Sequence, residues 1–163
     1  MNAHHTAPPP DNAGVLLPPP LIFLVPFVIG TWLEWRAAWP LVAAGGRARA
    51  VAGVLAIAAG VALGFSAVTE FQRRGTTILP ARRPTRAIVA AGPYRFTRNP
   101  MYLGMTIAYV GASLLINSMW PLLMLPVVLL AVDRYVIARE ERYLRAKFGD
   151  EYVAYTRRVR RWL

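Results

Sequence analysis

Residues 99–132 form a run of 34 residues without a charged side chain, and this run limits the fold more than any other feature. It is too long for one ordinary membrane-crossing helix, which needs about 20 apolar residues. Asn117 and Ser118 lie near its middle, and residues of these types favour a turn. The run therefore predicts a tight hairpin of two short helices, over residues 101–116 and 119–139. A single long tilted helix is the alternative.

Two further apolar runs precede this hairpin. Residues 21–35 are strongly apolar, and residues 50–69 give 20 consecutive uncharged positions rich in Ala and Gly. Twenty such residues can cross about 30 Å of hydrocarbon. With 56% hydrophobic residues in the whole chain, the sequence predicts an all-α polytopic membrane protein with four transmembrane helices and a cytoplasmic, amphipathic helical tail.

The ends of the chain fit this division. Residues 1–20 hold two proline triplets. This composition predicts a disordered tail over residues 1–19, which leaves residues 20–163 as a single membrane domain. An even number of spans puts both termini and the loop 70–100 on one side. That side holds sixteen of the basic residues, against three on the other. This asymmetry predicts an inner or plasma membrane protein with cytoplasmic N- and C-termini.

Composition excludes several kinds of site. The chain has no cysteine, and its two histidines, His4 and His5, lie in the N-terminal tail. We therefore expect no metal site and no histidine base in the membrane domain. The formal net charge of +11 could suit nucleic acid, but the arginines flank apolar spans. Anionic lipid headgroups are the expected partner, and nucleic acid is not.

The stretch before the hairpin, residues 92–104, reads Gly-Pro-Tyr-Arg-Phe-Thr-Arg-Asn-Pro-Met-Tyr-Leu-Gly. Pro100 suits the first position of a helix, and Asn99 suits the N-cap before it. The positive helix end beside Arg95 and Arg98 would favour an anionic group. The alternative is a capped helix start whose arginines merely reach the membrane interface.

The acidic residues and the tail give a second cluster. Glu140 and Glu141 are adjacent just where the fourth span should emerge, and neighbours on a helix point about 100° apart, so the two carboxylates should have different partners. After a stop at residues 148–149, Asp150 can cap a basic helix with tyrosines on one face. Such a helix can lie on a membrane or close over a site near its surface.

Together, these stretches resemble the integral-membrane methyltransferases of the isoprenylcysteine carboxyl methyltransferase and phospholipid N-methyltransferase group. The family pattern is Arg-His-Pro-x-Tyr, a hydrophobic stretch, and then Glu-Glu. Here it reads Arg-Asn-Pro-Met-Tyr from Arg98, the predicted hairpin, and Glu140-Glu141. The resemblance covers roughly residues 75–163, about half of the chain.

The resemblance implies a site for S-adenosylmethionine on the cytoplasmic side and a lipophilic acceptor such as a prenylcysteine-like carboxylate or a lipid amine. Asn99 stands where much of the family has histidine, and an asparagine cannot act as an acid or base near pH 7. It is therefore expected to position or bind. By carry-over, Arg98 and Asn99 are the candidate catalytic residues, and the cofactor-binding set is Tyr94, Arg98, Asn99, Pro100, Tyr102, Gly104, Glu140, Glu141, Tyr152 and Tyr155.

Two other functions compete with methyl transfer. Membrane sterol and steroid reductases resemble this architecture in their C-terminal halves and bind a nicotinamide cofactor, although four spans are few for them. A non-catalytic, lipid-binding membrane scaffold would need the arginines but gives no role to Glu140 and Glu141. The sequence identifies neither the acceptor atom that is methylated nor an oligomeric state.

Overall fold

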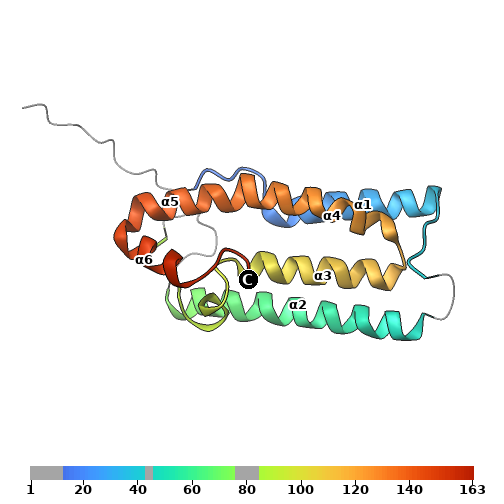
Figure 1. Cartoon of the computed structure of the whole chain (residues 1–163), viewed down its shortest axis with the longest axis horizontal. Helices are drawn as coiled ribbons and strands as arrows, with labels where there is room; N and C mark the ends of the chain where they lie inside the picture. Colours follow the sequence, from blue (N-terminus) through green and yellow to red (C-terminus); the bar gives the residue numbers. More distant parts are fainter. Residues whose placement is uncertain (1–12, 43–45, 76–84) are drawn as a thin grey trace, which may run out of the picture.

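The computed structural model describes residues 13–42, 46–75 and 85–163, and within these ranges the chain forms helices and no strand. The four longest elements of the bundle are α1 (Pro19–Arg36), α2 (Arg47–Arg73), α3 (Pro100–Ile116) and α4 (Met119–Ala131). Figure 1 shows them lying side by side along the long axis of the molecule. Helix α2 packs mainly on α3, and α1 mainly on α4.

Two helical stretches are long and apolar enough to cross a membrane. One is α2, and the other is the continuous helical rod Met119–Phe148, which begins with α4. Helix α3 is apolar but shorter, with 17 residues. Large apolar side chains such as Leu55 and Phe65 of α2 face outward. The all-helical class is thus confirmed with two candidate membrane-spanning helices, while the number of four spans stays a prediction.

Glycines bring α2 and α3 into backbone contact. A Cβ added at Gly104 would lie 2.6 Å from the carbonyl oxygen of Gly60, and one at Gly111 would lie 2.7 Å from that of Gly53. The two glycine pairs recur two turns apart on the same face of each helix. Small residues at such positions let apolar helices approach closely, as the composition of α2 predicts.

The predicted turn joins α3 to α4. Asn117 has a left-handed backbone with a φ of +56° and ends α3, while Ser118 is the N-cap of α4 and accepts a hydrogen bond from the backbone N–H of Trp120 at 3.3 Å. Asparagine tolerates this conformation better than most residues do. The turn therefore lies at the predicted residues, while the second helix continues past residue 139 to Phe148 and the membrane topology of the hairpin stays a prediction.

The second arm of the hairpin extends well past α1 and α3 (Figure 1). Helix α4 continues through the π-helical turn η2 (Val132–Ile137) into α5 (Ala138–Phe148). Gly149, with a φ of +50°, then reverses the chain into α6 (Asp150–Arg158). The predicted stop is confirmed, but Asp150 lies in the first turn of α6 and makes no capping hydrogen bond, because Gly149 holds the cap position.

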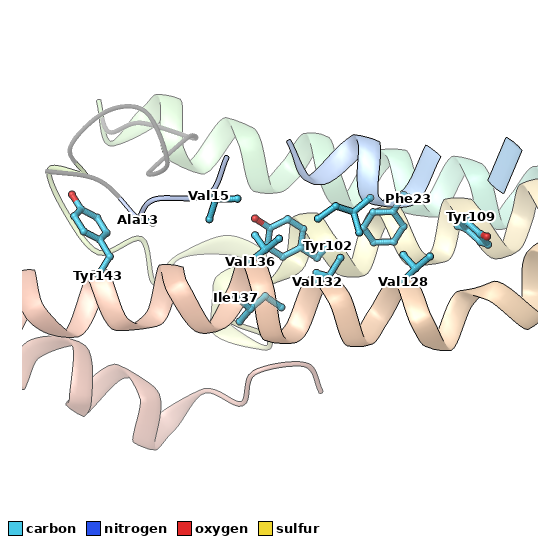
Figure 2. Packing of buried hydrophobic residues seen from close by; sticks show 11 residues of the cluster. Ala13, Val15, Phe23, Tyr102, Tyr109, Val128, Val132, Val136, Ile137 and Tyr143 are labelled. Carbon is cyan, nitrogen blue, oxygen red and sulfur yellow. The ribbon is translucent and has the colours of Figure 1, made fainter. Parts of the chain in front are cut away.

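A short segment before α1 lies against this rod. Ala13 and Val15 are buried in the main core beside Ile137 (Figure 2). The backbone N–H groups of residues 16 and 17 lie 3.2 and 3.4 Å from the Tyr135 hydroxyl, and Arg139 donates to the Gly14 carbonyl at 2.9 Å. Residues 13–18, expected to be part of the disordered tail, therefore make defined contacts. Residues 1–12 of that tail lie outside the described ranges.

Candidate functional site

A pocket lies where the rod, α6, the start of α3 and residues 85–99 meet, at the end of the bundle away from the Asn117–Ser118 turn. The short 3-10 helix η1 (Gly92–Arg95) forms part of this wall, and α2 contributes Phe71. About 710 Å³ of space lies between these walls, with open solvent at the mouth included.

Most of the residues assigned to a site from the sequence line this pocket: Tyr94, Arg98, Asn99, Tyr102, Glu140, Glu141, Tyr152 and Tyr155. Pro100 and Gly104 do not. Pro100 is buried as the first residue of α3, and Gly104 faces α2 in the glycine contact described above. The structure thus brings together residues that lie more than 50 positions apart in the chain.

The two adjacent glutamates have different surroundings, as their spacing on a helix requires. Glu140 accepts a hydrogen bond from the Tyr102 hydroxyl at 2.9 Å, and no cation among the described residues forms an ion pair with it. Glu141 is paired with two arginines: Arg98 at 3.2 Å and Arg161 at 2.7 Å. Glu140 is therefore the carboxylate with capacity left for a further positive charge.

Arg161 is the centre of an ion-pair network that ties the end of the chain to the rod. Its guanidinium donates to both carboxylate oxygens of Glu141, at 2.7 and 3.2 Å, and to both of Asp133, at 3.0 and 3.2 Å. The Trp162 indole also donates to Asp133, at 3.1 Å. Hydrogen bonds between charged groups of this kind are about twice as strong as neutral ones.

Several polar atoms in the pocket wall are buried without a hydrogen-bond partner among the described residues. They are the Thr85 hydroxyl, the Tyr94 hydroxyl, and Nε and Nη1 of Arg98. The Arg98 side chain is only 12% exposed, and its one ion pair uses Nη2. Buried polar groups are nearly always paired in folded proteins, so a cluster of unpaired ones in one pocket points to a ligand that pairs them.

Three tyrosines close the pocket on the side of α6. The Tyr155 hydroxyl donates to the Tyr94 carbonyl at 2.8 Å, which fastens α6 to η1. Burial, with the nearby Glu141 carboxylate, raises the pKa of Tyr152 to about 12, while Arg98 and Arg145 oppose the shift. Burial also raises the pKa of Tyr94 and of Tyr155. All three tyrosines therefore stay neutral at physiological pH, and all three line the pocket.

Asn99 is the N-cap residue of α3, as predicted, but its side chain makes no capping hydrogen bond. Its amide Nδ2 instead donates to the Arg161 carbonyl at 2.9 Å, and the Thr97 hydroxyl donates to the same carbonyl at 3.2 Å. The last residues of the chain therefore lie beside the start of α3, and Asn99 holds them there.

Sequence reasoning missed Thr85 and two further kinds of site residue. The first is the apolar lining, which carries no distinctive signal: Phe71, Ala87, Ile88, Val89, Met101, Ile137 and Leu144. The second is the pair Asp133 and Arg161. A signal existed for this pair, because Asp133 ends a 34-residue uncharged run and needs a cation close by.

The chain matches the family model described as phospholipid methyltransferase over residues 48–151, which is more than half of its length. Helices α2 to α5 and most of the pocket lie in this range.

Two curated proteins are also similar. A protein from Haemophilus influenzae described as uncharacterized is 40% identical over 63 residues, which cover 39% of this chain and all of that protein. The protein-S-isoprenylcysteine O-methyltransferase of Schizosaccharomyces pombe is 28% identical over 108 residues, which cover 60% of this chain and 46% of that enzyme. The match thus spans about half of the yeast enzyme. No solved structure matches.

The family model covers most of the helices that build the pocket and its paired glutamates, and the yeast enzyme is a methyltransferase by name. With these findings beside the geometry, the chain belongs to the phospholipid methyltransferase family of membrane methyltransferases.

Proposed function

We propose that this protein is an S-adenosylmethionine-dependent methyltransferase whose cofactor site is the pocket around Arg98, and that it methylates a lipophilic acceptor at one face of the membrane. The observation that carries the proposal is the pair of unpaired Arg98 donors beside a carboxylate without an ion pair, Glu140. The carboxylate of the cofactor's methionyl part can pair with Arg98, and its ammonium can pair with Glu140.

The rest of the wall also fits this cofactor. The N-terminal end of α3 faces the pocket through Asn99 and Met101, and its positive dipole favours a carboxylate at the same place as Arg98 does. The aromatic faces of Tyr152 and Tyr155 can attract a sulfonium, as aromatic rings attract other cations. The Thr85 and Tyr94 hydroxyls, unpaired in the wall, can bind the polar edge of a nucleoside.

When bound, S-adenosylmethionine supplies a methyl group on a positively charged sulfur, and the acceptor's lone pair takes this methyl as the sulfur–carbon bond breaks to leave a neutral thioether. The chain's own residues orient the reactants and exclude water. Arg98 and Glu140 fix the two charged ends of the methionyl group. Asn99 carries no proton that titrates near pH 7, so its role is to hold the wall in place through the Arg161 carbonyl.

The acceptor is expected to be a lipid or a lipid-modified molecule. The pocket opens at the end of a bundle whose outward surface is rich in apolar side chains. The yeast relative is named for an isoprenylcysteine substrate and the family for phospholipids, so a prenylcysteine-like carboxylate and a lipid amine are both candidates. We further propose four spans, a cytoplasmic site, and contact of the basic end with anionic headgroups.

Binding and transfer measurements test this function together. The purified protein in lipid nanodiscs should bind S-adenosylmethionine saturably and should not bind NADPH, the cofactor expected for a reductase. With cofactor labelled in its methyl group, label should pass to at least one member of a panel containing a prenylcysteine, a phospholipid amine and a lipophilic thiol. Binding of NADPH in place of S-adenosylmethionine, or binding of neither, would contradict the proposal.

A further inference from the structure

We infer that Arg161, two residues before the C-terminal residue of the sequence, positions the cofactor site by occupying Glu141 and so keeping Arg98 open to a ligand carboxylate. This inference rests on the proposed function. Arg161 does not line the pocket, so it acts on the ligand through these two residues. No part of the family resemblance assigns it a role.

The two carboxylate oxygens of Glu141 are shared unequally between Arg161 and Arg98. Arg161 takes both of them, with Nη2 2.7 Å from Oε2 and Nε 3.2 Å from Oε1. Arg98 reaches only Oε1, through Nη2 at 3.2 Å. Glu141 is 6% exposed, so water has little access to it. The orientation of this carboxylate is thus set by Arg161 and not by Arg98.

This unequal sharing leaves two hydrogen-bond donors of Arg98 without a partner. Its Nε and Nη1 are buried and have no partner among the described residues. A carboxylate and a guanidinium prefer a bidentate pair with two parallel hydrogen bonds. Without Arg161, Glu141 would be free to turn and form such a pair with Arg98. One of the two donors proposed to bind the ligand carboxylate would then be occupied from within the protein.

Arg161 is itself held in place by other residues. Asp133, on the π-helical turn η2, accepts two hydrogen bonds from Nη1 of Arg161, at 3.0 and 3.2 Å. The Arg161 carbonyl accepts from Asn99 and Thr97, and the backbone N–H of Arg98 donates to the Arg160 carbonyl at 2.9 Å. The guanidinium is therefore fixed from both its side-chain end and its backbone.

The test compares two ligands that differ only in the carboxylate. Dissociation constants for S-adenosylmethionine and for its decarboxylated analogue are measured by calorimetry with the full-length protein in nanodiscs. Arg161→Ala should weaken binding of S-adenosylmethionine by about 10- to 100-fold, the range for loss of a charged hydrogen bond. Binding of the decarboxylated analogue should change less than about threefold, because that ligand does not use Arg98.

Two further variants distinguish a role of Arg161 in positioning the cofactor site from a role in supporting the C-terminal tail. Arg157→Ala removes an exposed arginine of the same tail and should leave both dissociation constants unchanged. In an Arg98→Ala background, Arg161→Ala should cause no further loss, because both changes remove the same interaction. If Arg161→Ala does not fold, Arg161→Lys serves in its place, since an ammonium cannot hold both carboxylates in a fork.

The outcomes are distinct. Equal weakening of both ligands by the Arg161 variant would show a structural role only and overturn the inference, as would unchanged binding of S-adenosylmethionine. If the parent protein binds neither ligand, the proposed function itself fails, and the inference fails with it. A loss confined to the ligand with the carboxylate supports the assigned role.

Discussion

The two ends of the bundle differ in how their polar groups are paired. At the end with the α3–α4 turn, the Ser118 hydroxyl donates to Glu34 at 2.8 Å and the Trp120 indole donates to the Ala37 carbonyl at 2.7 Å. The Asn117 amide pairs with both backbone groups of Val42. At the other end, Arg98, Tyr94 and Thr85 hold buried polar atoms that no described residue pairs with.

This difference indicates which end is built for stability and which for binding. A buried polar group without a partner costs about 1–3 kcal/mol, so a fold keeps several of them together only where something else compensates. Of the unpaired buried atoms in the described residues, one lies outside the pocket, on Arg49, whose Nη1 already donates to the Leu115 carbonyl at 3.0 Å. The remaining ones converge on the pocket, where a charged and polar ligand would pair them.

The largest expected effect comes from Arg98. Changing Arg98→Met should weaken S-adenosylmethionine binding by about 1.5–3 kcal/mol, or about 10- to 150-fold, because a charged hydrogen bond to the ligand is lost. Thermal stability should change little, since Glu141 keeps its ion pairs with Arg161. Calorimetry and a melting curve measure the two quantities on the same sample.

Ser118→Ala is the matched change at the opposite end. It removes both the cap of α4 and the hydrogen bond to Glu34, and should lower the free energy of unfolding by about 1–2 kcal/mol. Cofactor affinity should not change. The proposed difference between the two ends would be contradicted if Arg98→Met lowered the free energy of unfolding as much as Ser118→Ala does. It would also be contradicted if Ser118→Ala weakened binding of S-adenosylmethionine.

A smaller effect tests the corrected role of Asn99. Its amide donates to the Arg161 carbonyl, and aspartate has no N–H to replace that donor. Asn99→Asp should therefore cost about 1 kcal/mol of stability and should be less stable than Asn99→Ala, because a carboxylate would face a carbonyl oxygen. Chemical denaturation of the two variants measures the order.

A capping role gives the reverse order. Aspartate is among the best N-cap residues and alanine among the poor ones, so Asp would then be the more stable variant. That result would restore the interpretation of Asn99 drawn from the sequence and remove its proposed part in holding the tail.

Much of the fold is predictable because its signals are local. The uncharged runs predicted the helices, and Asn117 and Ser118 predicted the turn between α3 and α4. Half of the pocket residues could also be predicted, because Arg98, Glu140 and their neighbours lie in short motifs that carry a family resemblance.

The contacts of the tail could not be predicted in the same way. Arg161 meets Glu141 and Asp133 only because Gly149 reverses the chain, and nothing local shows how far α6 folds back. In the sequence, nothing distinguishes Arg161 from the other basic residues of the tail. Asn99 was assigned to a cap because local rules favour it, but a carbonyl from 62 residues away takes its amide instead.

Hydrogen–deuterium exchange with and without S-adenosylmethionine tests the central claim most directly, because it compares both ends in one experiment. Added cofactor should slow exchange in residues 85–101 and 150–162 and leave the turn around Asn117 unchanged, since only the first two segments form the pocket wall and its support. Protection at the turn, or none at residues 85–101 while the cofactor is bound, would contradict the assignment of the pocket.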